Sequence, residues 1–317
     1  MNTFVLITTN DKIWNIKEFY SFLLDNQNKS IKIILNPEAA CLEYLQVYDI
    51  LDKFSFQSVT INTSNLLERH NFYKIAINKP YYYAEEIPRH VENLFHSWNG
   101  KKIFLCLYGR PSANRLGFIS YLNRHHQNLA HLSCHGNSFN DVDRTFFELE
   151  KLYRYRAESL VDFGEIATNF PLLLNKASKY SNIVYDYADT IITFYKDIFV
   201  DLVSETFLEG NVFFPTEKTF RPMLLKKPFI IMGPKNYMIY LRQMGFQTFY
   251  EYWDEDYDGY SPSIKFKKIL DVINNLSGKS VDELVNMYES MQNILDHNYN
   301  LITSNSFQRK IRLVNDK

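Results

Sequence analysis

Val203-Ser-Glu-Thr-Phe-Leu-Glu-Gly-Asn-Val-Phe-Phe-Pro-Thr-Glu-Lys-Thr-Phe220 joins a hydrophobic run, a polar loop and a helix start in one segment. The run ends at Ser204-Glu205, and Thr216-Glu217-Lys218 stands where a helix should begin. That helix must be short, because Pro228 and the apolar run 229–232 follow closely. A strand, a turn and a helix N-terminus together favour an anion, since free N–H groups and the positive end of the helix dipole converge there.

Two side chains at this predicted helix start carry suitable chemistry. Lys218 adds a full positive charge beside the helix N-terminus, and Glu217 adds a carboxylate that can hold sugar hydroxyls. The segment therefore predicts a binding site for a phosphate-bearing ligand, and a nucleotide sugar is the interpretation that uses both residues.

The alternation of apolar runs and amphipathic stretches extends over most of the chain. In the first third, Thr3–Thr9, Ile31–Leu35 and Ser58–Asn62 predict strands, and the stretches between them predict helices. Strand and helix keep alternating through residue 79, which predicts a parallel sheet with helices on both faces.

A second alternating series begins after Asn99-Gly100 and contains the opening segment. Its predicted strands are Ile103–Leu107, Leu129–Ser133, Phe199–Ser204, Phe229–Met232 and Phe246–Phe249. Helices are predicted at 113–126, at 141–155, from Glu217, at 234–244, at 262–275 and at 280–297.

The sequence thus predicts an α/β fold of two Rossmann-like lobes with a cleft between them, followed by C-terminal helices. We expect an N-terminal lobe over residues 1–97, a ligand-binding lobe over 98–300 and a last helix over 301–317. Whether that helix crosses back to the first lobe is left open. Ligands in such sheets bind at the carboxyl ends of the strands, and the opening segment lies at one of these ends.

Composition sets the broad class of the protein. The chain has 317 residues, 46% of them hydrophobic and 16% aromatic, which is typical of a globular protein. A net charge of −1 provides no general attraction to nucleic acid or to an anionic membrane. Cys41, Cys106 and Cys134 have neither metal nor redox spacing. We expect reduced thiols, a cytoplasmic location, no leader peptide and no membrane span.

A second motif opens the predicted ligand-binding lobe, in the segment Ile103–Leu122. A strand ends at Leu107, Arg110 lies in the following turn, and Arg115 lies in the first turns of the next helix. An Arg that leaves a strand-to-helix turn can bind a diphosphate with its two-pronged guanidinium group. The alternative is that both are solvated loop charges.

The two motifs together resemble the donor half of GT-B glycosyltransferases, and the fucosyltransferase-type pattern most of all. The resemblance implies that Arg115 and Lys218 contact a donor diphosphate and that Glu217 holds the donor ribose or sugar, with Glu205 at the strand end. Here Ser204-Glu205-Thr206 replaces the Glu-Asn-Ser of that family. The segment Thr216–Phe249 also resembles uncharacterised glycosyltransferase-like proteins of phages and bacteria.

The resemblance implies a metal-independent glycosyltransferase whose co-substrate is a nucleotide-diphosphate sugar and which needs no further cofactor. The donor site would include Arg110, Arg115, Glu205, Thr216, Glu217 and Lys218. An inverting enzyme also needs a carboxylate base, and Glu38, Glu68 and Asp11 are candidates, although each also fits a helix start or a surface acid. The acceptor stays open among a glycan, a protein and modified DNA.

Two rival functions remain. The first is a phage-type glycosyltransferase that modifies a DNA base, for which Lys265, Lys267, Lys268, Arg309, Lys310 and Arg312 could form a basic groove. The second is a nucleotide-binding module without catalysis. Salt-sensitive DNA binding would favour the first function, and donor binding without turnover would favour the second.

Three further clusters have structural alternatives. The acidic run Trp253–Tyr260 contains oxygen ligands but lacks EF-hand spacing, which favours a solvated loop. The group His125, His126, His131 and His135 fits no zinc pattern. Tyr81-Tyr82-Tyr83 could stack on a sugar or a base, or simply pack a linker.

Overall fold

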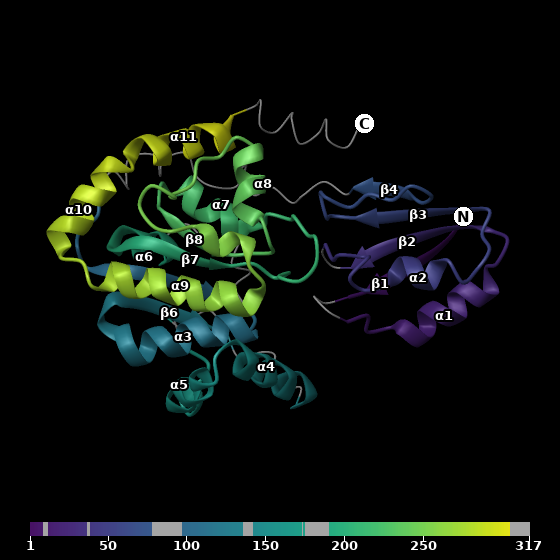
Figure 1. Ribbon diagram of the computed structural model, residues 1–317, viewed down its shortest axis with the longest axis horizontal. Helices are drawn as coiled ribbons and strands as arrows, with labels where there is room; N and C mark the ends of the chain where they lie inside the picture. Colours follow the sequence, from purple (N-terminus) through teal and green to yellow (C-terminus); the bar gives the residue numbers. More distant parts are fainter. Residues whose placement is uncertain are drawn as a thin grey trace.

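The computed structural model describes residues 1–8, 12–36, 39–77, 97–135, 142–172, 174 and 190–304. Two parallel four-stranded sheets, each with its own helices, form two Rossmann-like α/β lobes that lie side by side (Figure 1). The predicted lobe boundary near residue 97 stays a prediction, because residues 78–96 lie outside the described residues, as do Tyr81–Tyr83.

The N-terminal lobe is a sheet with the strand order β1-β2-β3-β4. Its elements, in chain order, are β1 (Asn2–Ile7), α1 (Ile16–Asp25), β2 (Ser30–Asn36), α2 (Val47–Leu51), β3 (Ser58–Thr63) and β4 (Lys74–Ile77). All three strand pairs are parallel. The first three strands therefore confirm the prediction within one or two residues, whereas β4 follows a loop rather than a helix.

The core of this lobe lies on one face of the sheet. In β2, Ile31, Ile33 and Leu35 are buried and pack with Phe19 of α1 and Leu51 of α2, while the intervening β2 residues are only half-buried. A strand order that never reverses places right-handed crossovers on a single face, which explains the arrangement. The expected second helical layer is not found among the described residues of this lobe.

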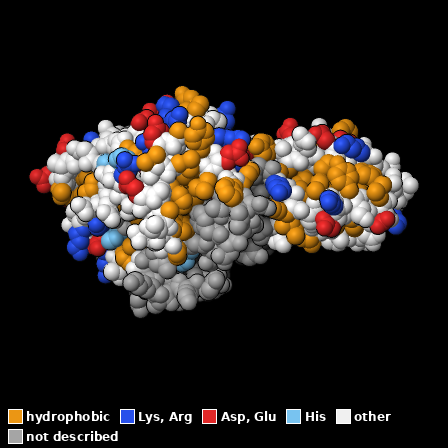
Figure 2. Space-filling model, turned by 90° about the horizontal axis from the view of Figure 1, so that it is seen from below, with side chains coloured by type: hydrophobic (Ala, Val, Ile, Leu, Met, Phe, Trp, Pro, Cys, Tyr) orange, Lys and Arg blue, Asp and Glu red, His pale blue; other side chains and the backbone are white. Residues whose placement is uncertain are grey.

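Hydrophobic side chains gather on the outside of this lobe (Figure 2). Val5 and Ile7 of the edge strand β1 are each 43% exposed. The side-chain amide of Asn15 accepts a hydrogen bond from the Ile7 N–H and donates one to the Val5 carbonyl. These two bonds occupy main-chain groups that an edge strand would otherwise offer to another strand.

The C-terminal lobe has the strand order β6-β5-β7-β8, again with every pair parallel. Its elements are β5 (Lys102–Tyr108), α3 (Ala113–His126), β6 (Ala130–Cys134), α4 (Val142–Tyr155), α5 (Glu158–Ala167), α6 (Thr190–Asp197), β7 (Ile198–Ser204), α7 (Glu217–Leu224), β8 (Phe229–Met232), α8 (Tyr237–Gln243), α9 (Pro262–Ser277), α10 (Val281–Ser290) and α11 (Gln292–Thr303).

This second sheet is buried on both faces. Along β5, Phe104 and Cys106 belong to the main core, whereas Leu105 packs on the opposite face with Tyr195 and Leu225. In Figure 1 helix α3 is drawn below the strands and α9 crosses in front of them, whereas α7 and α11 lie above them. The predominantly apolar sequences of β5 and β7 are typical of central strands in such sheets.

Two predictions for the C-terminal lobe are wrong. Phe246–Phe249 is not a strand, because its two phenylalanines insert into the core from an irregular segment. The predicted helix 280–297 is two helices, α10 and α11, with Met291 between them. Within the described ranges, no helix is both long enough and apolar enough to cross a membrane.

Candidate functional site

The candidate site lies where β5 and β7 end, at the carboxyl edge of the C-terminal sheet. From β5 the chain crosses to β6 on one side and later returns to β7 on the other. This reversal is a topological switch point, and the loops after the two strands diverge from it. The predicted donor residues come from these two loops and from the helices that follow them, α3 and α7.

Arg115 ties the two strand ends together. Its guanidinium donates to the Ser204 carbonyl oxygen at the end of β7 and to the Arg110 carbonyl oxygen after β5, both over 2.9 Å. The residue is 5% exposed. Arg115 therefore braces the switch point, and its predicted contact with a diphosphate stays a prediction.

Ser204 is held from the same side by a second residue of α3. The Asn114 side-chain amide donates to Ser204 Oγ, and Ser112 Oγ donates to Asn114 Oδ1 over 2.9 Å. Both Asn114 and Ser204 are buried. The start of α3 is thus connected to the end of β7 by two adjacent side chains, of which sequence reasoning singled out only Arg115.

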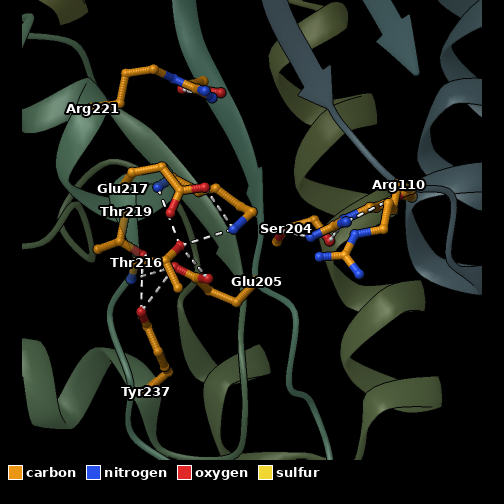
Figure 3. A network of polar contacts seen from close by, with 11 residues as sticks. Arg110, Ser204, Glu205, Thr216, Glu217, Thr219, Arg221 and Tyr237 are labelled. Carbon is orange, nitrogen blue, oxygen red and sulfur yellow. Dashed lines mark hydrogen bonds and ion pairs between the residues drawn. The ribbon is translucent and has the colours of Figure 1, made fainter. Parts of the chain in front are cut away.

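Glu205 ties the end of β7 to the start of α7 (Figure 3). Its carboxylate accepts hydrogen bonds from the Thr216 N–H at 3.2 Å, the Thr216 hydroxyl at 2.7 Å and the Thr219 hydroxyl at 2.6 Å. The Tyr237 hydroxyl donates a fourth bond over 3.2 Å. Glu205 is only 2% exposed, so it is an internal anchor.

This anchor corrects the expectation of free donors at the start of α7. The Lys218 N–H donates to Thr216 Oγ1, and the Thr219 N–H donates to the Thr216 carbonyl oxygen. Thr216 also donates to Glu205 through its N–H and its hydroxyl. Protein atoms therefore accept the hydrogen bonds that the sequence analysis assigned to an external anion. The described geometry leaves side-chain cations as the main attraction for such a ligand.

Lys218 and Glu217 form a pair at the rim of this network. Lys218 Nζ lies 2.9 Å from Glu217 Oε1 and 3.1 Å from Thr216 Oγ1, and the two side chains are 17% and 26% exposed. Burial alone would raise the pKa of the Glu217 carboxyl, but the ammonium of Lys218, a main-chain hydrogen bond and the charge of Arg221 together lower it below its ordinary value. Glu217 is thus kept ionised as a hydrogen-bond acceptor.

Arg110 is the exposed cation of the loop after β5. Within the described ranges its guanidinium forms no ion pair, and its carbonyl oxygen is fixed by Arg115. Figure 3 draws Arg110 on one side of Ser204 and Glu217 on the other. The switch point therefore has a cation on each side, Arg110 and Lys218.

Of the three candidate bases, Asp11 and Glu38 lie outside the described residues. Glu68 is buried after β3, where it accepts from the Tyr48 hydroxyl at 2.6 Å and from the Asn65 amide at 3.1 Å. Burial raises the pKa of Glu68 above its ordinary value. Both carboxylate oxygens are engaged, which favours a structural tether over a base open to an acceptor.

The acidic run is largely built into the fold, so the prediction of a solvated loop is wrong for its buried half. Asp258 is 4% exposed and accepts from the Met238 N–H at the start of α8, over 2.9 Å. Glu255 is 7% exposed and accepts from the Phe249 N–H and from Arg242. Among the described residues, no group of three or more side chains could hold a metal ion, and the four histidines form no such group.

Lys265 does not belong to the predicted basic groove, because its side chain is buried. Lys265 is 1% exposed and donates to the carbonyl oxygens of Gly233 and Pro234 and to Asp258. Burial lowers its pKa to about 8. Lys268 pairs with Asp256, Lys267 is exposed, and residues 309–312 lie outside the described ranges.

Sequence reasoning missed Thr219 and Tyr237, which complete the Glu205 network. Thr219 follows Thr216 by one helical turn, so the spacing of the two hydroxyls could have indicated a shared partner. Tyr237 begins α8, and only the fold brings its hydroxyl to Glu205.

Comparisons with known proteins leave the family open. No protein-family profile matches the chain, and no curated protein matches it. One similar solved structure is the N-terminal domain of trehalose-6-phosphate phosphatase from Candida albicans, with a TM-score of 0.37 and 12% identity. The match covers 90% of this chain and 65% of that one.

Proposed function

We propose that this protein is a glycosyltransferase that takes a sugar from a nucleotide-diphosphate donor and transfers it to an acceptor hydroxyl. One observation carries the proposal. At the switch point of the C-terminal sheet, the hydrogen bonds of the buried residues Arg115 and Glu205 fix the loop that carries Arg110 and the start of α7, which carries Lys218. The crevice outside such a switch point is where α/β proteins bind nucleotides.

The two cations have the chemistry that donor cleavage requires. When the sugar leaves, negative charge builds up on the β-phosphate, and preorganised cations stabilise it without a metal ion. In the proposed complex Arg110, from the loop after β5, and Lys218, from the first turn of α7, take this role. The ionised Glu217 beside Lys218 accepts hydrogen bonds from hydroxyls of the donor ribose or sugar.

The experiment is a binding survey with the full chain. Isothermal calorimetry and saturation-transfer NMR against UDP-, GDP-, CDP- and dTDP-sugars are expected to find one nucleotide that binds with and without EDTA. The same donor is then incubated with glycan, protein and hydroxymethylated DNA acceptors. Absence of binding by every nucleotide sugar would remove the basis of the proposal.

A nucleotide-binding module without catalysis is the second candidate, and the engagement of both Glu68 oxygens favours it. It predicts donor binding with neither hydrolysis nor transfer for every acceptor tested. The burial of Lys265 and the Lys268–Asp256 pair leave the DNA-modifying alternative without comparable support.

A further inference from the structure

The loop between β7 and α7, residues 205–216, leaves the C-terminal lobe and reaches the N-terminal one (Figure 1). We call these residues the strap. Phe207, Val212 and Phe214 are buried in the core of the N-terminal lobe, whereas Leu208 and Phe213 belong to the core of the C-terminal lobe. The strap therefore has hydrophobic anchors on both sides.

A loop of the N-terminal lobe in turn contacts the C-terminal lobe. Residues 64–68, which follow β3 and which we call the receiving loop, carry Leu66 and Leu67 against the core of the C-terminal lobe. The Leu66 N–H donates to the Phe213 carbonyl oxygen over 3.0 Å. Each lobe thus packs apolar side chains of a loop against the core of the other lobe.

Asn65 lies where the two loops meet and is completely buried. Its Oδ1 accepts from the N–H groups of Phe213 at 3.0 Å and Leu67 at 3.1 Å. Its Nδ2 donates to the Asn211 carbonyl oxygen at 3.0 Å and to Glu68 at 3.1 Å. One side chain therefore satisfies main-chain groups of both loops, and such groups are costly to leave unbonded.

The tip of the strap fits only a glycine. Gly210 has φ +74°, and a Cβ at this position would lie 2.5 Å from Cys41 Cβ and 3.0 Å from Tyr44 Cβ. The strap backbone therefore touches the N-terminal lobe directly. A side chain at this position would force the strap and the lobe apart.

The described helices and strands of the two lobes contribute little to the contact between the lobes. Among the helices and strands that the structure describes, every extensively packed pair lies within a single lobe. The two ends of the strap are also joined, since Thr216 at its end donates hydrogen bonds to Glu205 at its start. The strap is thus a closed loop set between the lobes.

We propose that the strap and the receiving loop form the joint that fixes the two lobes relative to each other, with Asn65 as its central residue. The joint makes the lobes unfold together and sets their orientation. This inference does not depend on the proposed transferase activity.

The test compares two buried asparagines in the full chain. Asn65→Ala removes the centre of the joint. Asn298→Ala is the matched control, because Asn298 is equally buried and bridges Gln247 within the C-terminal lobe alone. Hydrogen exchange, calorimetry and small-angle X-ray scattering are measured on each.

For Asn65→Ala we expect amides of the strap and the receiving loop to exchange roughly a hundredfold faster. Thermal unfolding should split into two transitions, and the radius of gyration should increase. For Asn298→Ala we expect a single transition at lower temperature with the strap still protected. A single transition and a protected strap in Asn65→Ala would overturn the proposal.

Gly210→Ala supplies a second route if Asn65→Ala does not fold. Its control is Gly164→Ala, because a Cβ at Gly164 meets nothing within 4 Å. Gly210→Ala should accelerate exchange in the strap and separate the unfolding of the lobes, whereas Gly164→Ala should do neither. Identical unfolding and exchange in the two alanine variants would contradict the joint.

Discussion

The Arg115 guanidinium donates a hydrogen bond to the main-chain carbonyl oxygen of Ser204 over 2.9 Å, although the residues are 89 positions apart in sequence. The contact joins the first turn of α3 to the last residue of β7. Because the same guanidinium holds the Arg110 carbonyl oxygen, it sets the spacing of the loops that follow β5 and β7.

Arg115→Ala is expected to lower the free energy of unfolding by about 3 kcal/mol, because buried carbonyl oxygens lose a charged donor. Arg154→Ala is the control, since Arg154 forms an exposed helical pair with Glu150 and its loss should cost less than about 0.5 kcal/mol. Urea denaturation measures both. A similar cost for the two variants would show that Arg115 is not a brace.

Lys218→Ala and Arg110→Ala are expected to lower kcat/KM for the donor by about a hundredfold each, the typical effect of removing one group that stabilises developing charge. Both side chains lie at the rim of the site, so urea denaturation should show little change in stability. Lys101→Ala is the control, because Lys101 is an exposed lysine beside the start of β5, at the opposite edge of the same sheet. Turnover as high as that of the control would exclude these residues from the donor site.

Asp258→Ala is expected to cost about 3 kcal/mol of stability, because it leaves the ammonium of Lys265 buried without its carboxylate and removes an acceptor at the start of α8. Asp256→Ala, two residues away, breaks only the solvent-screened pair with Lys268 and should cost far less. Equal costs in urea denaturation would mean that the acidic run is a solvated loop after all.

Lys227 predicts a dependence of stability on pH. Burial lowers its pKa to about 7 from an ordinary 10.5, so above pH 7 the unfolded chain retains a proton that the folded chain has lost. This contribution raises the free energy of unfolding with pH, by at most about 1.4 kcal/mol per unit. Relative to wild type, Lys227→Met should lose this slope between about pH 7 and pH 9.

The control for this titration is Lys235→Met, since Lys235 is exposed. Its stability should follow that of the wild-type protein throughout the range. Parallel pH profiles for wild type and Lys227→Met would mean that Lys227 remains charged in the folded state.

Strands with long apolar runs were predictable from the sequence. β8 begins and ends at the predicted residues, and β7 differs by one, because a strand buried on both faces is predominantly apolar; the buried Asp201 is the exception in β7. Phe246–Phe249 misled the prediction, because its phenylalanines are equally apolar but enter the core from an irregular segment. A local run of apolar residues indicates that a segment is buried, but it does not show whether the backbone is a strand or irregular.

The candidate site was predictable as a location but not as a set of contacts. Thr216 is the N-cap of α7 as its sequence indicates, because a threonine hydroxyl before a helix satisfies a free N–H locally. Arg115 and Glu205 are charges with no local partner, and the sequence therefore favoured an external ligand for them. In the fold their partners come from segments distant in sequence, which turns both into internal anchors.

The sequence by itself determined the alternation of strands and helices, and with it two parallel sheets, with Arg110 in the loop after one strand of the second sheet and Lys218 at a helix start after another. Hydrophobic periodicity and helix capping depend on residues close together in the chain, so the sequence alone predicts them. Only the tertiary structure decided which charges are buried and paired, and that the segment Glu205–Thr216 crosses to the other lobe. Those outcomes depend on contacts such as Asn65 with Phe213, 148 residues apart, which exist only after the sheets have formed.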